Sequence, residues 1–131
     1  MKDTSGDLSY FLSVQRHTSD DFVLLQGFDT LLAPSLRMGA NGGVHALSNV
    51  IPEVFDELLE TASEEREAEL QREAIAPLFE LCAEYGFAPA TKTALVHHGV
   101  IPSEEVRPPL VELDEDVRSA IGDAVDRAID Q

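Results

Sequence analysis

The stretch FVLLQG, residues 22–27, decides the fold class because it is a short apolar run that ends at a glycine. Such a run is typical of a fully buried strand in a parallel sheet. Capping side chains and helical spacing predict a helix before it, over residues 6–17, and another after it, over residues 28–38. A second short strand is expected over residues 43–47, and residues 1–2 provide a stub of a third. Strands that alternate with helices predict parallel βα units, and therefore an α/β fold.

The rest of the chain has a helical pattern, in which apolar residues form one face of each expected helix. The expected segments are helices over residues 52–62, 64–85, 89–98 and 114–129, an interruption of the second helix at Pro77, and an extended connection over residues 101–113. Two complete parallel strands form a sheet that is too narrow to bury its own faces, and its edges stay open. The pattern therefore indicates part of a fold.

The charge of the chain restricts its partners. Nine Lys and Arg residues against 25 Asp and Glu residues give a net charge of −16 over 131 residues. This charge argues against binding to nucleic acid or to an anionic lipid surface. Scattered carboxylates favour a halophilic protein, and an ordinary acidic, solubilising surface is the alternative. The sequence shows neither a membrane span nor a signal peptide, so a cytoplasmic location is expected.

Cysteine and histidine give little support for a metal centre. Cys82 is the one cysteine, so an internal disulfide and a thiolate cluster are both excluded, and we interpret it as a buried small hydrophobe. His97 and His98 are adjacent and point in different directions, which makes them poor chelators. Together with His45 they are interpreted as surface or core histidines. No metal site is expected.

Four segments, taken in order, resemble the dihydrodipicolinate synthase and N-acetylneuraminate lyase family. They are MKDTSGD at residues 1–7, LLQGFD at residues 24–29, GANGGV at residues 39–44 with Asn49 beyond it, and VRPPL at residues 106–110. Any one of these motifs has low specificity. Their order and spacing together make a strong resemblance that covers essentially the whole chain.

The resemblance implies a partial (β/α)8 TIM barrel followed by an α-helical C-terminal extension. The last two to three βα units of the barrel fall on residues 1–62 and the extension on residues 63–131. A complete barrel needs about 250 residues, so roughly its first half is absent from this sequence. The resemblance further implies that Met1 is internal to a longer chain or that the gene is truncated, and that the full-length protein is a homo-oligomer.

The resemblance also implies a site. Lys2 is implied to form a Schiff base with pyruvate or another 2-keto acid, so no cofactor is expected beyond this covalent link. The amine attacks only when it is unprotonated, which a low-dielectric barrel interior favours. Gly27, Asp29 and Val44 are implied substrate-binding positions. The residues alone leave alternatives, in which Lys2 is a solvated terminal residue, Gly27 a turn glycine, Asp29 a helix N-cap and Val44 a core valine.

The implied function is that of a lyase fragment that makes or breaks a carbon–carbon bond. Aspartate semialdehyde with pyruvate, a 2-keto-3-deoxy sugar acid, and a sialic acid are the competing substrates, and the segments at residues 28–29 and 49–53 lean toward the sugar acids. The family's proton-relaying tyrosine and its carboxylate-binding loop lie in the absent half, so the chain alone is expected to be inactive or nearly so. A non-catalytic half-barrel assembly module and a decayed gene fragment are the alternatives.

Overall fold

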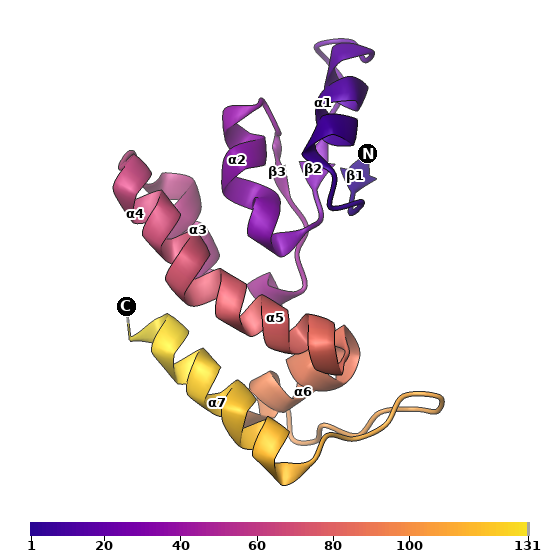
Figure 1. Cartoon of the computed structure of the whole chain (residues 1–131), viewed down its shortest axis with the longest axis vertical. Coiled ribbons are helices and arrows are strands. Elements are labelled where there is room, and N and C mark those ends of the chain that lie inside the picture. The colour runs from indigo at the N-terminus through magenta and orange to yellow at the C-terminus, as the bar shows by residue number, and fades with distance from the viewer. Residues whose placement is uncertain (131) are drawn as a thin grey trace. The chain divides into compact units, whose positions relative to one another are not determined.

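The structure is a computed structural model that describes residues 1–130. It forms two compact units, Met1–His45 and Ala46–Gln131. The first unit holds the sheet of the described chain, and the regular elements of the second are all helices (Figure 1). The boundary between barrel and extension that the sequence places after residue 62 stays a prediction, since it refers to a complete barrel.

The first unit is built on a three-stranded parallel sheet. Its strands are β1 (Lys2–Asp3), β2 (Leu25–Gln26) and β3 (Gly42–Gly43), in the order β1-β2-β3. Lys2 lies opposite Leu25, and Leu25 lies opposite Gly42. The parallel arrangement and the short strand at the N-terminus are as the alternation of elements predicts.

The helices of the first unit are α1 (Leu8–Arg16), the 3₁₀-helix η1 (Asp29–Leu31) and α2 (Leu32–Arg37). Asp7 caps α1, because its Oδ1 accepts hydrogen bonds from the backbone N–H groups of Ser9 at 2.8 Å and Tyr10 at 3.1 Å. This satisfies two of the donors that a helix N-terminus leaves open. The first helix therefore begins where the polar capping sequence predicts.

The predicted strand over residues 22–27 is wrong at its beginning. Only Leu25–Gln26 pairs as a strand, and Phe22 and Val23 are exposed and not buried. The two residues before Leu25 are hydrogen-bonded without forming a ladder, since the Met1 amine donates to the Val23 carbonyl at 2.5 Å and the Asn41 N–H donates to the Leu24 carbonyl at 2.9 Å. Ladder pairing, and not the apolar run, sets the length of this strand.

The predicted strand over residues 43–47 is also wrong in extent. The observed strand is Gly42–Gly43, and the 3₁₀-helix η2 occupies Leu47–Asn49. Gly43 lies opposite Gln26, the last residue of β2, and beyond it the chain of β2 turns into η1. Since the neighbouring chain turns away there, the residues after Val44 have no ladder to extend.

The second unit is helical throughout its regular elements. These are η2, α3 (Pro52–Glu60), α4 (Glu64–Glu69), the π-helix η3 (Leu70–Ile75), α5 (Ala76–Tyr85), α6 (Phe87–His97) and α7 (Glu115–Ile129). Its core consists of small and branched side chains from η3, α5, α6 and α7, among them Leu70, Ile75, Leu78, Cys82, Ala90, Ala94, Ile121 and Val125. The prediction that Cys82 is a buried small hydrophobe is confirmed.

The predicted interruption at Pro77 lies before that residue. Residues Leu70–Ile75 form a wide π-turn, and α5 begins at Ala76 with Pro77 in its first turn. Proline has no N–H to donate, and its ring crowds the carbonyl of the residue four positions earlier. The preceding turn widens to accommodate this, so α4, η3 and α5 follow one another without a loop.

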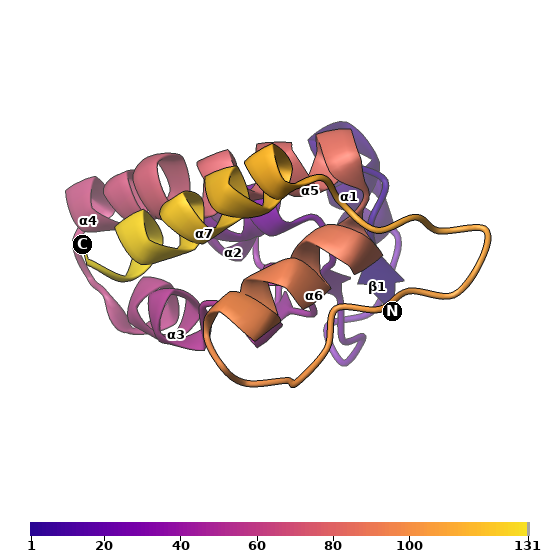
Figure 2. The ribbon, with the colours of Figure 1, turned by 90° about the horizontal axis from the view of Figure 1, so that it is seen from below.

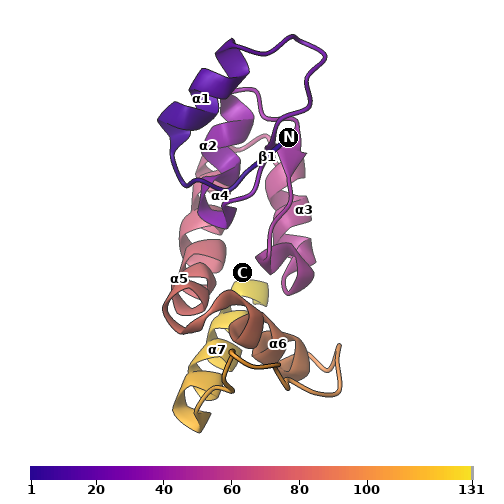
Figure 3. The same cartoon turned by 90° about the vertical axis from the view of Figure 1, so that its right-hand side faces the viewer.

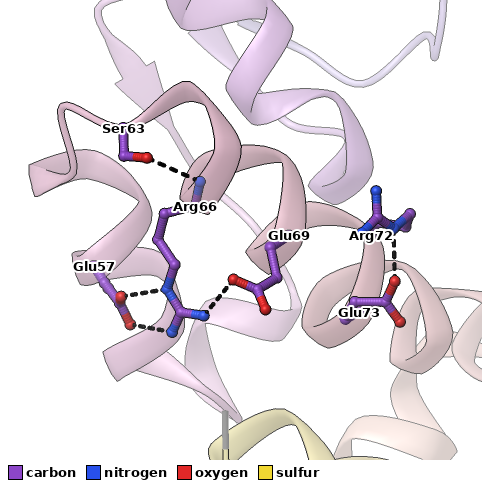
Figure 4. A network of polar contacts seen from close by, with 6 residues as sticks. All are labelled: Glu57, Ser63, Arg66, Glu69, Arg72 and Glu73. Atoms are coloured by element: carbon purple, nitrogen blue, oxygen red, sulfur yellow. Dashed lines mark hydrogen bonds and ion pairs between the residues drawn. The ribbon is translucent and has the colours of Figure 1, made fainter.

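Arg66 joins α3 to α4 on the surface of the second unit. Its Nε donates to Glu57 at 2.7 Å and a terminal nitrogen donates to Glu69 at 2.9 Å, while Ser63 Oγ caps α4 by accepting from the Arg66 N–H (Figure 4). The hydrogen bond from Arg66 lowers the pKa of the Glu57 carboxyl. All of these groups face water, so the network fixes geometry more than it adds stability.

The segment between α6 and α7 is an open loop that leaves α6 and returns to the start of α7 (Figures 2 and 3). The extended connection predicted here is confirmed. Glu104 ties it down, because its Oε2 accepts from the Thr93 hydroxyl at 2.7 Å and its Oε1 pairs with Arg118 at 2.7 Å. Arg118 also donates through Nε to the Leu113 carbonyl at 2.7 Å.

Replacing Glu104 with Ala is expected to lower the free energy of unfolding by about 1–3 kcal/mol, because the half-buried Arg118 and the buried Thr93 both lose a partner. Urea unfolding followed by circular dichroism measures this. The matched control is Glu73→Ala, which breaks the exposed pair with Arg72 and should leave the midpoint unchanged. Equal effects of the two variants would contradict the anchoring role of Glu104.

Within residues 1–130, the structure contains no helix that is both long enough and apolar enough to cross a membrane.

Candidate active site

The segments that the sequence singles out meet at one edge of the sheet. Lys2 and Asp3 form β1, Gly27 directly follows β2, and Val44 directly follows β3. Parallel strands bring their carboxyl ends to the same edge, which is where α/β sheets and barrels bind ligands. Three positions that lie far apart in the sequence are therefore neighbours in the fold.

This edge has two faces, because side chains alternate along a strand. Lys2 lies in register with Leu25 and Gly42 and shares their face, and Val44, two residues beyond Gly42, returns to it. Lys2 is exposed and Val44 is 48% exposed, whereas Gln26 on the opposite face is 1% exposed. The uncovered face of the sheet is therefore the one that carries Lys2.

Gly27 lies directly beneath the Lys2 side chain. A Cβ atom at Gly27 would overlap Lys2 Cε and Thr4 Oγ1, and would approach the Asp3 carbonyl oxygen to 2.9 Å. The Gly27 N–H donates to that same carbonyl at 2.6 Å. Gly27 is buried, and its lack of a side chain leaves space for the Lys2 methylene chain and the Thr4 hydroxyl to pack over the end of β2.

Gln26 fixes the turn that follows β2. Its Oε1 accepts from the N–H groups of Gly27 at 2.9 Å and Phe28 at 2.8 Å, and its Nε2 donates to Ser35 Oγ at 2.8 Å. A buried amide with three hydrogen bonds holds its surroundings in one arrangement. The path of the chain from Gly27 to Asp29 depends on this one side chain.

Replacing Gln26 with Leu is expected to lower the free energy of unfolding by about 2 kcal/mol, because the Phe28 N–H and the Ser35 hydroxyl are left in the interior without this partner. Ser35→Ala is the graded control, since it removes one of the three hydrogen bonds and is expected to cost about 1 kcal/mol. Urea unfolding of both variants decides the point. A Gln26→Leu protein no less stable than Ser35→Ala would refute this role of Gln26.

Asp29 and Val44 differ in their surroundings. Asp29 is 2% exposed and is the first residue of η1, so the residue in the N-cap position is Phe28 and the helix-cap alternative for Asp29 is wrong. The Val44 side chain is half exposed, so it is not a core valine in this chain, and its N–H donates to the Gln26 carbonyl at 2.9 Å. Val44 thus presents both side chain and backbone at the edge.

Two further residues belong to this edge and were not predicted from the sequence. Thr4 carries its hydroxyl over Gly27 beside Lys2, two positions along the chain from the lysine. His45 is 6% exposed, and its ring lies over Gly43. Burial lowers the pKa of the His45 imidazole; the charge of Asp29 raises it, and the charge of Lys2 lowers it. The position of Thr4 two residues after Lys2 was the available signal, since alternate residues share a face.

The described residues do not gather into a metal site. Among residues 1–130, no three His, Cys, Asp or Glu side chains lie close enough together to hold a metal ion. His97, one of the three histidines weighed as ligands, instead pairs with Asp126 at 2.8 Å across α6 and α7.

Known proteins place this chain in one family. The model of the dihydrodipicolinate synthetase family matches residues 1–128. The 4-hydroxy-tetrahydrodipicolinate synthase of Archaeoglobus fulgidus is 35% identical over 119 residues, which cover 88% of this chain and 40% of that protein. The synthase of the same name from Cytophaga hutchinsonii is 32% identical over 114 residues, covering 86% of this chain and 38% of that protein.

A solved structure shows the same fold. A dihydrodipicolinate synthase from Bacillus anthracis superimposes with a TM-score of 0.86 at 28% identity, over 95% of this chain and 43% of that one. The chain thus spans about 40% of the length of the curated relatives named above. The family model covers nearly every residue, so this chain belongs to the dihydrodipicolinate synthetase family.

Proposed function

We propose that this chain is the C-terminal part of a Schiff-base-forming lyase barrel, and that Lys2 is its nucleophile. The observation that carries the proposal is the position of Lys2. It stands at the carboxyl edge of the parallel sheet, on the uncovered face, with its stem crossing Gly27. Membership of the dihydrodipicolinate synthetase family supports it, because the match includes the segment around Lys2.

In the proposed reaction, the unprotonated Lys2 amine attacks the ketone carbon of pyruvate or another 2-keto acid. Loss of water leaves an iminium ion, which withdraws electrons and allows the neighbouring carbon to become an enamine. That carbon then forms or breaks a carbon–carbon bond. Gly27 and the Val44 backbone border the substrate, and the Thr4 hydroxyl beside Lys2 offers a hydrogen bond to it. No cofactor takes part beyond the covalent lysine link.

The proposed substrate class is a 2-keto acid, with pyruvate as the common partner. The relatives from Archaeoglobus fulgidus and Cytophaga hutchinsonii carry the name of a synthase, which favours condensation of pyruvate with an aldehyde. The segment Phe28–Asp29 leans toward cleavage of sugar acids, but Asp29 is buried at 2% exposure and stands in η1. Pyruvate serves both directions of the chemistry and is therefore the probe to use.

The sheet supports the view that activity needs further chain. The strand order is β1-β2-β3, and within residues 1–130 the outer edges of β1 and β3 have no partner strand. An open parallel edge is a site for strand addition, and a barrel abolishes such edges by closure. We therefore expect this chain alone to catalyse no turnover, and the complete protein to be a cytoplasmic homo-oligomer with a closed barrel.

The test is reductive trapping on the chain itself. Pyruvate and cyanoborohydride are added in concentrated KCl, and the modified residue is mapped by mass spectrometry. The chain has two lysines, Lys2 and Lys92, so Lys92 is an internal reference. The proposal expects the adduct on Lys2 to form at least about tenfold faster than on Lys92, as for an amine activated by its site. Equal labelling of the two lysines would remove the assignment.

A non-catalytic assembly module is the second candidate, and the open edges of β1 and β3 favour it. In that case the chain recruits a partner strand without any chemistry at Lys2. Light scattering in concentrated salt distinguishes it. A concentration-dependent oligomer with no preference for labelling Lys2 fits the assembly module, and a monomer without exposed apolar surface argues against it.

A further inference from the structure

His45 and Asp29 are both buried at the end of the sheet. They are 6% and 2% exposed, and Asp29 is near enough for its charge to act on the imidazole. His45 directly follows Val44 at the exit of β3, and Asp29 begins η1 after the exit of β2. Two buried side chains on separate connections thus lie within range of each other's charge, close to the edge that carries Lys2, Gly27 and Val44.

The ring of His45 is held against the backbone of β3. A Cβ atom on Gly43 would overlap the ring at Cε1 and would lie 2.6 Å from Nδ1 and 2.7 Å from Nε2. The ring therefore occupies the space where a Gly43 side chain would be. Gly43 lies opposite Gln26 and not Lys2, so His45 packs on the face away from the lysine.

This packing lies beside the backbone hydrogen bond that joins β3 to β2 at the carboxyl edge of the sheet. The Val44 N–H donates to the Gln26 carbonyl at 2.9 Å, between the residue that His45 covers and His45 itself. The ring packs on Gly43 and is attached at residue 45, so it touches the chain on both sides of the Val44 N–H. The placement of Val44 is therefore coupled to the state of His45.

We infer that His45 is a positioning residue. Its ring packs on Gly43 near the buried Asp29 and holds the Val44 backbone in place at the end of β3. Protonation of the imidazole loosens this packing. The inference concerns the shape of the edge and stands whether or not Lys2 forms an imine. It predicts that the edge is ordered at neutral pH and becomes less ordered as the solution turns acidic.

The direction of the pH dependence follows from the surroundings of His45. Burial is the largest influence and lowers its pKa below the ordinary 6.5; Asp29 opposes this, and Lys2 adds to it. A histidine with a lowered pKa in the folded protein favours folding above its unfolded pKa. That contribution is lost as the pH falls from about 6.5 through the folded pKa, because the unfolded chain binds the proton more readily.

Nuclear magnetic resonance of the isotope-labelled chain between pH 5 and pH 8 tests this positioning role of His45. The His45 ring signals and the Val44 amide are expected to titrate with one shared midpoint below 6.5. Below the midpoint, protection of the Val44 amide against hydrogen exchange should fall relative to the Phe11 amide in α1, by up to tenfold for each unit of pKa difference. Asp29→Asn should lower the midpoint, and Lys2→Met should raise it.

His45→Phe is the decisive variant, because it keeps a ring over Gly43 but cannot titrate. The Val44 amide should then keep its protection across the whole pH range. His98→Asn is the matched control and should leave the shared midpoint in place. A Val44 amide that ignores the His45 titration, or a midpoint unmoved by both Asp29→Asn and Lys2→Met, overturns the inference. The last two variants retain His45 and decide the matter even if His45→Phe does not fold.

Discussion

Replacing Lys2 with Met in a completed barrel is expected to reduce turnover by about 10⁴-fold or more, the scale of loss that follows removal of a covalent nucleophile. The reason is chemical, because methionine has no amine to condense with a ketone. Lys2 and Lys92 are the two lysines of the chain, and Lys92 Nζ donates to the Glu105 carbonyl between α6 and the following loop.

The barrel can be completed by fusing this chain behind the preceding part of the Archaeoglobus fulgidus synthase, the relative that is 35% identical to it. Condensation of pyruvate with aspartate semialdehyde and cleavage of a 2-keto-3-deoxy sugar acid are then measured side by side. Lys92→Met serves as the control and should keep full activity. Retained turnover in the Lys2→Met fusion would mean that another residue is the nucleophile.

Replacing Gly27 with Ala is expected to lower the free energy of unfolding by about 3 kcal/mol and to displace the Lys2 side chain. The added Cβ would overlap Lys2 Cε and Thr4 Oγ1, which can rotate away, but it would also lie 2.9 Å from the Asp3 carbonyl oxygen. That oxygen belongs to the β1 backbone and accepts the Gly27 N–H, so relieving the contact strains the β1–β2 pairing. Both stability and labelling of Lys2 by pyruvate should fall.

Gly99→Ala is the matched control for this prediction. Gly99 has a φ of 69°, a conformation that disfavours alanine, but a Cβ atom there meets no other atom within 4 Å. Its cost is therefore conformational, at about 1 kcal/mol, and Lys2 labelling should be unchanged. The two variants are compared by urea unfolding and by the rate of adduct formation. Unchanged labelling in Gly27→Ala would show that Lys2 does not depend on the space above Gly27.

The sequence predicted the helices of this protein better than its strands. Capping residues and proline positions are local signals, and they place the start of α1 at residue 6, two residues before the observed Leu8, and the start of α3 at the observed Pro52. Strand limits depend on a neighbour in space, so the apolar run before Leu25 was taken as strand although only Leu25–Gln26 has ladder pairing. The wide turn of η3 likewise reflects how the chain before Pro77 adapts to the proline.

For the candidate site, the sequence singled out positions to consider but not their surroundings. Lys2, Gly27 and Val44 were each marked by a motif, and parallel pairing brings all three to one edge. Asp29 was weighed between substrate contact and helix cap, yet it is buried with His45 near it. No local pattern distinguishes a histidine that packs over Gly43 from one on the surface, because the contact is set by the turn of the backbone after β3.

The sequence by itself determined the family, the α/β character and the lysine on which the proposed chemistry rests, because motifs and helix signals are carried by residues close together in the chain. Only the tertiary structure decided which face of the sheet is uncovered and that Gly27 leaves space for the Lys2 side chain. It also decided that the buried Gln26 and His45 pack on the opposite face of the sheet at this edge. The first two features arise from pairing between strands more than fifteen residues apart, and the last depends on how the chain turns after β2 and β3, so register and burial decide them and composition does not.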